Sequence, residues 1–483
     1  MNFPDISWLA LLPTLVVTGT AFVVLIADLF MEGPDREGLG WIGIVGLLVA
    51  SLVSAMLWNT HQSGFAGTFI VDRYALFFNV VFCLAAGLTL LMSMDYLDTI
   101  DVRSGEYYVL LLFATAGMLM MAAATDLIVL FLGLEVMSVG VYVLAGLARR
   151  DLRSSEAAVK YFLLGAFATG FLVFGIALIY GAFGTTALGP VSAKLATSAA
   201  GEERALALIG MALLLVGFGF KIAAVPFHAW APDVYEGAPT SVTALMAVGV
   251  KAAAFAAFAR VFLHHLAGLA ADWTGVVWIL AVLTMTLGNV VALLQRNIKR
   301  MLAYSSIAHA GYLLVGMVAG KEAGGAAILY YLLVYALMNL GAFAVVVALA
   351  RHGEPNEDLD DYAGLGFKYP FLGFSMAVFM LSLAGIPSLA GFTGKFYLFS
   401  AAVKSGYVGL AVIGVLNSVV SMYYYAGVLA KMYMSEGNRE VEALTHRPHL
   451  LATLLITAAG TIFLGLFPSW AFELARSAFQ SLS

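Results

Sequence analysis

Charged residues are scarce in this sequence of 483 residues. Only 24 Lys and Arg and 29 Asp and Glu are present, which is 11% of the chain, whereas about 25% is usual in globular proteins. Hydrophobic residues make up 62%. This composition supplies too little polar surface to coat a soluble fold of this size, which excludes a soluble multidomain enzyme. No long basic run is present either, so nothing supports nucleic-acid binding.

Cysteine is almost absent. The single residue, Cys83, lies in an apolar stretch between Phe77 and Met92. One thiol cannot form an intrachain disulfide, and alone it cannot hold a zinc ion or an iron–sulfur cluster. We therefore expect neither a disulfide nor a cysteine-bound metal within this chain.

Long apolar runs, separated by short polar or Gly- and Pro-rich segments, predict an all-α polytopic membrane protein with about fourteen transmembrane helices. The runs are unbroken, whereas the strands of a membrane barrel alternate at every second residue. The N-terminus lacks the basic segment of a signal peptide, so the first run is expected to be a retained span. The predicted helix cores are 8–30, 40–58, 73–94, 107–124, 127–147, 155–180, 204–225, 240–263, 273–293, 301–319, 326–350, 368–401, 407–431 and 449–470.

The distribution of Lys and Arg predicts the orientation of these helices, because short basic loops stay on the cytoplasmic side. Thirteen of these residues lie in loops after odd-numbered helices, and six lie on the opposite side. Both termini are therefore expected on the outer, periplasmic side of the membrane.

Five further basic residues fall within predicted spans. Arg260 lies near the end of its helix, where a long side chain is expected to snorkel to the headgroups. Lys160 is one or two turns inside its helix, so snorkelling and a functional role both stay open. Lys221 and Lys251 have apolar flanks on both sides, and each would cost about 3 kcal/mol if it faced lipid. We expect these two to face a polar interior. The fifth is Lys395.

Two further titratable residues lie deep in predicted spans. Glu135 is about nine residues into its helix, and a carboxylate there needs a cation or a proton. It either forms a fixed ion pair between helices or a switchable pair that changes the proton affinity of a lysine. His309 is either a buried histidine satisfied by a hydrogen bond or a proton relay, with Ser305 and Ser306 about one turn away.

Proline interrupts two of the predicted helices, at Pro226 and Pro387. Each break has a lysine within eight residues, Lys221 in the first and Lys395 in the second. These are either ordinary kinks in a packed bundle or unwound segments at ion sites. The two helices are five apart, and an odd separation indicates two inverted five-helix repeats. The predicted organisation is an N-terminal three-helix segment, two inverted repeats and a C-terminal helix, at residues 1–106, 107–265, 266–435 and 436–483.

Three motifs carry a resemblance to a known family. The segments from Pro226 to Thr240 (PFHAWAPDVYEGAPT), from Asn297 to Tyr312 (NIKRMLAYSSIAHAGY) and from Ser382 to Phe396 (SLAGIPSLAGFTGKF) resemble the antiporter-like subunits of respiratory complex I. The first resembles the signature of the subunit N family, which includes mitochondrial NADH dehydrogenase subunit 2. The other two are shared with Mrp-type cation/proton antiporters.

The resemblance implies roles for the buried charges. Glu135 and Lys221 match a glutamate–lysine pair at mid-membrane, Lys251 matches the next relay lysine, and Lys395 matches the lysine of the second broken helix. Lys160 and His309 resemble additional residues of the polar axis.

The function implied is proton translocation across the bacterial inner membrane, driven by electron transfer in partner subunits of an NADH:quinone oxidoreductase. No nucleotide, flavin or cluster motif occurs in this chain, so no cofactor is expected here. NADH, flavin, iron–sulfur clusters and quinone are expected in partner subunits. The expected partners are other membrane subunits of complex I and the lipid bilayer. A cation/proton antiporter subunit, stand-alone or Mrp-type, and a passive structural subunit are the alternatives.

Overall fold

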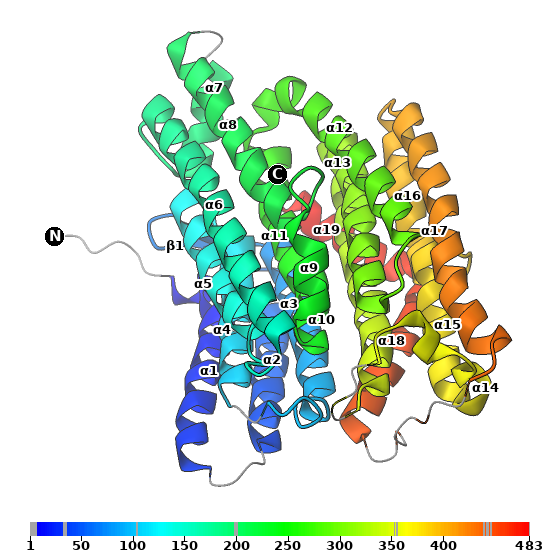
Figure 1. Cartoon of the computed structure of the whole chain (residues 1–483). Helices are drawn as coiled ribbons and strands as arrows, with labels where there is room; N and C mark the ends of the chain where they lie inside the picture. The colour runs from blue at the N-terminus through cyan, green and yellow to red at the C-terminus, as the bar shows by residue number, and fades with distance from the viewer. Residues whose placement is uncertain are drawn as a thin grey trace.

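The chain folds into a bundle of helices that mostly run side by side (Figure 1). The computed structural model describes residues 7–31, 36–102, 105–197, 201–351, 353, 356–437, 440, 444 and 447–482. The long helices are α1 (Leu12–Phe30), α2 (Glu37–Met56), α3 (Arg73–Met94), α4 (Glu106–Ala123), α5 (Leu127–Ala145), α6 (Leu152–Phe183), α8 (Glu202–Lys221), α12 (Ala270–Ala292), α13 (Ile298–Leu349), α15 (Pro370–Ala384), α16 (Ala390–Lys404), α17 (Val408–Met434), α18 (Pro448–Leu466) and α19 (Pro468–Gln480).

Shorter elements connect these helices. One continuous helical stretch consists of α10 (Thr240–Leu245), the π-helix η2 (Met246–Val250), α11 (Lys251–Ala259) and the π-helix η3 (Arg260–His265). The strands β1 (Gln62–Gly64) and β2 (Phe69–Val71) form an antiparallel hairpin that the all-α prediction did not include. The remaining short elements are α7 (Leu188–Thr197), α9 (Trp230–Gly237), α14 (Leu365–Lys368) and the 3-10 turns η1 (Trp8–Ala10), η4 (Ala267–Leu269) and η5 (Leu359–Tyr362).

The prediction of a helical membrane protein is confirmed, although the number of spans differs. Among the described residues, twelve helices are long and apolar enough to cross a membrane, against about fourteen predicted. One of them, α13, has 52 residues and merges two predicted spans, which meet at Gly320 (φ 83°). Another predicted span is divided into α15 and α16, each of 15 residues and too short to count. The C-terminal region also differs, because Pro468 starts a second helix, α19, after α18.

Both predicted interruptions are present. The helix α8 ends at Lys221, and α9 begins only at Trp230. The helix α15 ends at Ala384, and α16 begins at Ala390. In each break the backbone leaves the helical path next to a buried lysine.

Acidic and amide side chains cap the N-termini of several helices. Asp72 accepts a hydrogen bond from the backbone of Ala75, and Asp126 accepts two from the first turn of α5. Asn297 caps α13 in the same way. These caps satisfy backbone N–H groups that have no partner within the helix, and so fix where each helix begins.

Burial differs strongly between the helices. The helix α13 is almost entirely buried, whereas α1, α6 and α17 expose much of their apolar surface. Exposed large side chains include Phe162 and Phe167 on α6 and Leu416 and Tyr423 on α17. An apolar exterior around a buried polar interior is the arrangement expected of a protein surrounded by lipid or by membrane partners.

Candidate proton-carrying site

Lys221 lies at the end of α8 and is buried. Its Nζ donates a hydrogen bond to Tyr142 Oη at 3.3 Å. It also lies 5.1 Å from the centre of the Tyr142 ring and 5.2 Å from that of Tyr161. Aromatic faces attract a cation, so these two rings stabilise a positive charge on Lys221.

Glu135 lies nearby on α5 but has a different direct partner. Its Oε1 accepts a hydrogen bond from Thr169 Oγ1 at 3.0 Å. In this structure, where both residues are described, no ion pair within 4 Å joins Glu135 to Lys221. The expected pair is therefore not in direct contact in this conformation. Thr169 and Tyr142 are contacts that the sequence analysis did not anticipate.

The break between α8 and α9 is held by side-chain hydrogen bonds to the backbone. Trp230 Nε1 donates to the carbonyl of Phe220 at 3.0 Å. The backbone N–H of Val225 donates to Thr284 Oγ1 at 3.0 Å. The Trp230 ring also stacks on Tyr161, with the ring centres 4.4 Å apart. These contacts replace helical bonds lost at the break and fix the surroundings of Lys221.

Lys251 begins α11, directly after the π-helix η2. It is buried, and its Nζ donates to the carbonyl oxygen of Ser306 at 2.5 Å and to the Ser306 hydroxyl. Both acceptors are neutral. The prediction that Lys221 and Lys251 face the protein interior agrees with exposures of 3% and 1%.

His309 lies in a chain of hydroxyl groups within the second half of the protein. Its Nδ1 is 2.5 Å from Tyr331 Oη, and its Nε2 is 3.0 Å from Tyr425 Oη. Tyr425 Oη also bonds the hydroxyl of Ser305. Both ring nitrogens therefore have partners, and the sequence Ser305–Tyr425–His309–Tyr331 forms one continuous hydrogen-bonded chain.

Lys395 lies on α16 and reaches back to the end of α15. Its Nζ donates to the carbonyl oxygens of Leu383 at 2.8 Å and Ala384 at 3.1 Å. It also lies 4.9 Å from the centre of the Tyr312 ring. Gly385 has a φ of 92°, which frees these carbonyls from the helix. Lys395 therefore lies beside carbonyls that the break has released from helical bonding.

A polar network surrounds Tyr312. Asn289 Nδ2 donates to Tyr312 Oη at 3.0 Å, and Tyr424 Oη donates to Asn289 Oδ1 at 2.9 Å. Asn289 also contacts Asn417 at 3.3 Å. This network was not predicted from the sequence. Asparagine within an apolar helix is a signal that could have indicated it, because a buried amide needs partners.

Lys160 lies away from the buried lysines, on the surface of α6. Its side chain is 40% exposed and pairs with Glu156 at 2.7 Å and Asp233 at 2.8 Å. Arg300 pairs with Asp233 and with Glu236, both at 2.8 Å. These side chains line a cavity of about 190 Å³ at one end of the bundle.

The charge state of this surface cluster follows from its neighbours. Asp233 lies in α9, outside the candidate spans. Partial burial acts to raise its pKa, but hydrogen bonds from Lys160 and Arg300, together with their charges, outweigh burial and hold the pKa below its ordinary value. Asp233 is therefore an anion that binds two cations.

The prediction that Arg260 snorkels to the headgroups is wrong. Arg260 is only 1% exposed and forms two hydrogen bonds with Asp72, at 2.9 Å and 3.0 Å. Its Nε donates to the carbonyl of Ala122 at 2.9 Å, and its guanidinium stacks on Tyr74 at 4.8 Å. The cause is Asp72, the cap of α3, which offers a buried carboxylate far away in the sequence.

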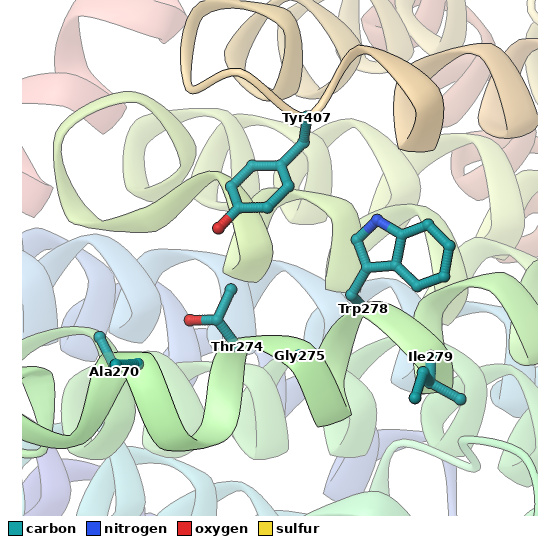
Figure 2. A pocket seen from close by; sticks show the side chains of 7 residues that line it. Ala270, Thr274, Gly275, Trp278, Ile279 and Tyr407 are labelled. Atoms are coloured by element: carbon teal, nitrogen blue, oxygen red, sulfur yellow. The ribbon is translucent and has the colours of Figure 1, made fainter.

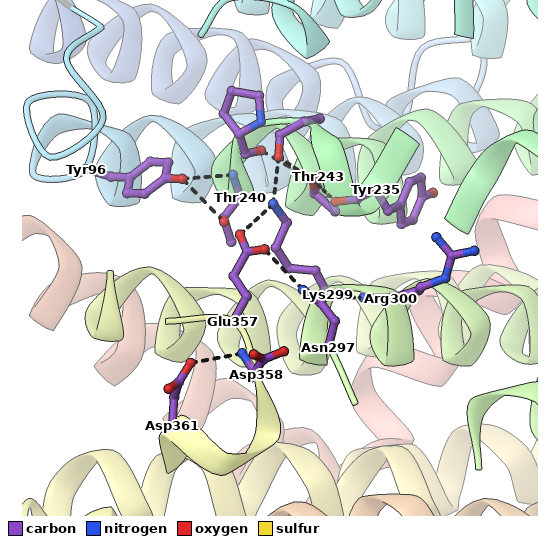
Figure 3. A network of polar contacts seen from close by, with 12 residues as sticks. Tyr96, Tyr235, Thr240, Thr243, Asn297, Lys299, Arg300, Glu357, Asp358 and Asp361 are labelled. Carbon is purple, nitrogen blue, oxygen red and sulfur yellow. Dashed lines mark hydrogen bonds and ion pairs between the residues drawn. The ribbon is translucent and has the colours of Figure 1, made fainter. Parts of the chain in front are cut away.

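A second, largely buried ion pair lies within the second half of the chain, and its lysine also binds the first half (Figure 3). Lys299 Nζ donates to Glu357 at 2.9 Å and to the carbonyl of Ala238 at 2.8 Å. Nearby, Tyr96 Oη accepts a bond from the backbone of Thr240 at 3.2 Å. A lysine in the first turn of a helix opposes the helix dipole. That mismatch is the sequence signal that could have indicated an internal partner for Lys299.

No three His, Cys, Asp or Glu side chains of the described residues lie together as a metal site would require. The buried polar side chains of the described residues include lysine, arginine, histidine, asparagine, aspartate, tyrosine and serine.

Comparison with known proteins identifies the family. Residues 124–421 match the model of the NADH:quinone oxidoreductase/Mrp antiporter transmembrane family. NADH-quinone oxidoreductase subunit N of Trichlorobacter lovleyi is 49% identical over 476 residues, which is 99% of this chain and 98% of the relative. This chain belongs to the subunit N family of NADH-quinone oxidoreductase. The predicted family resemblance is confirmed, and the chain is a membrane subunit of that enzyme complex.

Solved structures agree with this family. A chain of respiratory complex I from Thermus thermophilus with bound aureothin is 35% identical, with a TM-score of 0.81, over 95% of this chain and 98% of that one. A chain of the Mrp complex from Dietzia sp. matches with a TM-score of 0.83 over 98% of this chain and 97% of that one. The latter is only 21% identical and shows the fold alone.

Proposed function

We propose that this subunit moves protons across the bacterial inner membrane through Glu135, Lys221, Lys251, His309 and Lys395, driven by electron transfer in partner subunits. The main support for the proposal is that, among the described residues, these buried lysines donate hydrogen bonds to neutral oxygens and not to carboxylates. Lys251 and Lys395 bind only neutral oxygens among the hydrogen bonds of the described chain. A lysine that served only to hold helices together would be expected to bind a carboxylate, as Arg260 does.

Lysine and arginine are used differently within this interior. Arg260 is permanently charged and is fixed by Asp72. The lysines are buried beside hydroxyls, carbonyls and aromatic faces, where burial disfavours the charge and the oxygens favour it. Opposed effects of this kind allow a group to gain and lose a proton, which supports transport by Lys221, Lys251 and Lys395.

The hydrogen bonds form separate sections rather than one unbroken chain. One section contains Lys221 and Tyr142. Lys251 contacts Ser306, the neighbour of Ser305, from which the second chain reaches His309. We propose that water joins the sections.

Buried polar atoms without protein partners support this role for water. The hydroxyls of Tyr161 and Tyr335 and both amide atoms of Asn339 have no hydrogen-bond partner in the structure. Tyr161 lies beside Lys221, and the Tyr335 ring is centred 5.1 Å from that of His309. Buried polar groups are ordinarily satisfied by protein or by water, so these atoms indicate where water would extend the path.

Lys160 has a different place in the proposal. Its exposed cluster with Asp233 and Arg300 lies at the surface, where protons enter or leave, rather than on the buried axis. We propose that this cluster is the surface end of the first half-path.

We propose that the chain contains two repeats, one around each of the two helix breaks. Residues 107–265 and 266–435 form two inverted five-helix repeats, each with a broken helix beside a lysine, and residues 1–106 and 436–483 flank them. Both termini face the periplasm. NADH, flavin, iron–sulfur clusters and quinone bind in partner subunits, and this chain contacts other membrane subunits of complex I and the bilayer.

The antiporter alternative is less well supported. The identity to subunit N is 49%, whereas the Mrp chain is 21% identical. Affinity purification of the chain from mildly solubilised membranes tests the choice. We expect NADH:quinone oxidoreductase activity to copurify with it. Recovery without this activity, together with cation/proton exchange in vesicles that contain the chain alone, would favour the antiporter.

A further inference from the structure

A large hollow lies at one end of the bundle, where α12 begins, α13 is kinked at Gly320 and α16 ends. Its volume is about 1030 Å³, and its walls come from α12, α13, α16 and α19. Three cationic side chains line it, Lys321, Lys404 and Arg476, against one carboxylate, Glu322. The hollow therefore has a positive balance of charge.

These three cations have few strong partners within the protein. Among the described residues, Lys321 has one side-chain hydrogen-bond partner, His264 Nδ1, at 3.4 Å, and Arg476 lies 3.6 Å from Glu473. Within the described part of the chain, Lys404 has no carboxylate at ion-pair distance. The cations are thus available to an anion from outside the chain.

A second hollow adjoins the first along α12, and Figure 2 shows the side chains that line it. It has a volume of about 680 Å³ and shares Ala270 and Thr274 with the first. Its other walls include Trp278 and Ile279 on α12 and Tyr407, which points toward α12 from the turn after α16. The wall is apolar except at Thr274 and at the polar atoms of Trp278 and Tyr407, and Tyr and Trp are the residues that favour the membrane interface.

We propose that the two hollows together bind one anionic phospholipid. Lys321, Lys404 and Arg476 bind the phosphate, and an acyl chain runs past Tyr407 and Trp278 along α12. The hollow lies at the ends of spans, which is the depth of lipid headgroups. Clusters of Lys and Arg at that depth attract anionic lipid.

The apolar surface below the second hollow favours a lipid over an acidic protein segment. Val276, Ile279 and Leu283 are exposed on α12 and continue from the hollow toward mid-membrane. An acyl chain covers such a strip, whereas an acidic peptide that neutralised the cations would leave it bare. Lipid therefore matches both the charged and the apolar part of the site.

Photolabelling of the whole complex tests this site. The purified complex is placed in phosphatidylcholine nanodiscs that contain a small fraction of phosphatidylglycerol with a diazirine in its acyl chain. Mass spectrometry should find labels on residues 274–283. Replacement of Lys404 or Arg476 by Gln should lower this labelling about fivefold each. The matched control is Lys194→Gln on α7, a cation at the same end of the bundle that does not line either hollow.

Three results would overturn the proposal. One is equal labelling by a phosphatidylcholine probe with the same diazirine, a comparison that needs no variant. Another is full labelling in Lys404→Gln and Arg476→Gln complexes. The third is cross-linking of this surface to a neighbouring subunit in place of lipid. If a neutral variant does not assemble, the charge-conserving variant Lys404→Arg replaces it. The Lys404→Arg complex should assemble and keep the labelling of the unaltered complex. Loss of labelling in the Lys404→Arg complex would contradict a contact between this cation and the lipid phosphate.

Discussion

Lys395 binds the broken end of the helix that precedes its own. Its Nζ is 2.8 Å from the carbonyl oxygen of Leu383, the last turn of α15, although the side chain comes from α16. Hydrogen bonds therefore join the Lys395 ammonium group directly to the break between α15 and α16. The carbonyls that α15 cannot use in helical bonding become the ligands of the lysine.

This relationship predicts that charge alone is insufficient at position 395. In Lys395→Arg the cation stays but cannot release its proton at accessible pH. We expect both Lys395→Arg and Lys395→Ala complexes to assemble, and both to pump protons at least about tenfold more slowly than the unaltered complex. Acidification of inverted membrane vesicles measures the rate. Lys404→Arg, at the exposed end of the same helix, is the control, and full pumping by Lys395→Arg would reduce Lys395 to a fixed charge.

A second prediction concerns Lys221. Lys221→Ala should leave the complex assembled, but both proton pumping and the coupled NADH oxidation should fall because the first half-path loses its carrier. The two rates are measured in the same vesicles, with assembly checked on native gels. Lys194→Ala, which removes a lysine outside the interior, should change neither. Normal turnover and a normal proton-to-electron ratio in Lys221→Ala would remove Lys221 from the path.

The shared hydroxyl of Tyr425 supplies a third prediction. It contacts both His309 and Ser305, so Tyr425→Phe breaks the chain while it keeps the ring. We expect pumping to fall about tenfold. Tyr423→Phe is a matched control, because that ring lies two residues away and is 75% exposed on the outside of α17. If the two variants pump equally well, the hydroxyl chain through His309 is not the route.

The Arg260–Asp72 pair leads to a prediction about stability. Arg260→Met leaves a buried carboxylate unpaired and should destabilise the subunit by about 3–5 kcal/mol, measured as loss of assembled complex on heating. Asp72→Asn should also destabilise it, although Asn can still cap α3. The double variant should regain much of the loss.

The control for this prediction is an ion pair nearer the surface. Arg204→Ala, which breaks the half-exposed Arg204–Asp272 pair, should cost about 1 kcal/mol or less. A loss as small for Arg260→Met would contradict this account.

The sequence was informative where the evidence was local. Pro226 and Pro387, each near a lysine in an apolar stretch, predicted both broken helices. Contacts between distant segments could not be predicted in this way. Asp72 is 188 residues from Arg260, and no periodicity connects them. The same limit explains why Thr169 was missed as the partner of Glu135 and Asp233 as the partner of Lys160.

The number of helices illustrates a different limit. Hydropathy separated 301–319 from 326–350, but the structure carries the helix through the polar turn, with a single deviation at Gly320. Hydropathy also treated 368–401 as one span, although Gly385 and Ser388, both with positive φ, divide it. Hydropathy identifies the segments that cross the membrane, whereas the backbone dihedral angles determine where each helix ends.

Lys251, a buried lysine whose hydrogen-bond partners among the described residues are neutral, is the most direct test of proton transport by such lysines. The assembled complex with Lys251→Met, which keeps most of the length of the side chain and removes the titratable group, is reconstituted in vesicles. The number of protons moved per NADH oxidised is then measured. The account predicts normal assembly, slower NADH oxidation and fewer protons per NADH than in the unaltered complex. An assembled Lys251→Met complex with an unchanged ratio and unchanged turnover would contradict it.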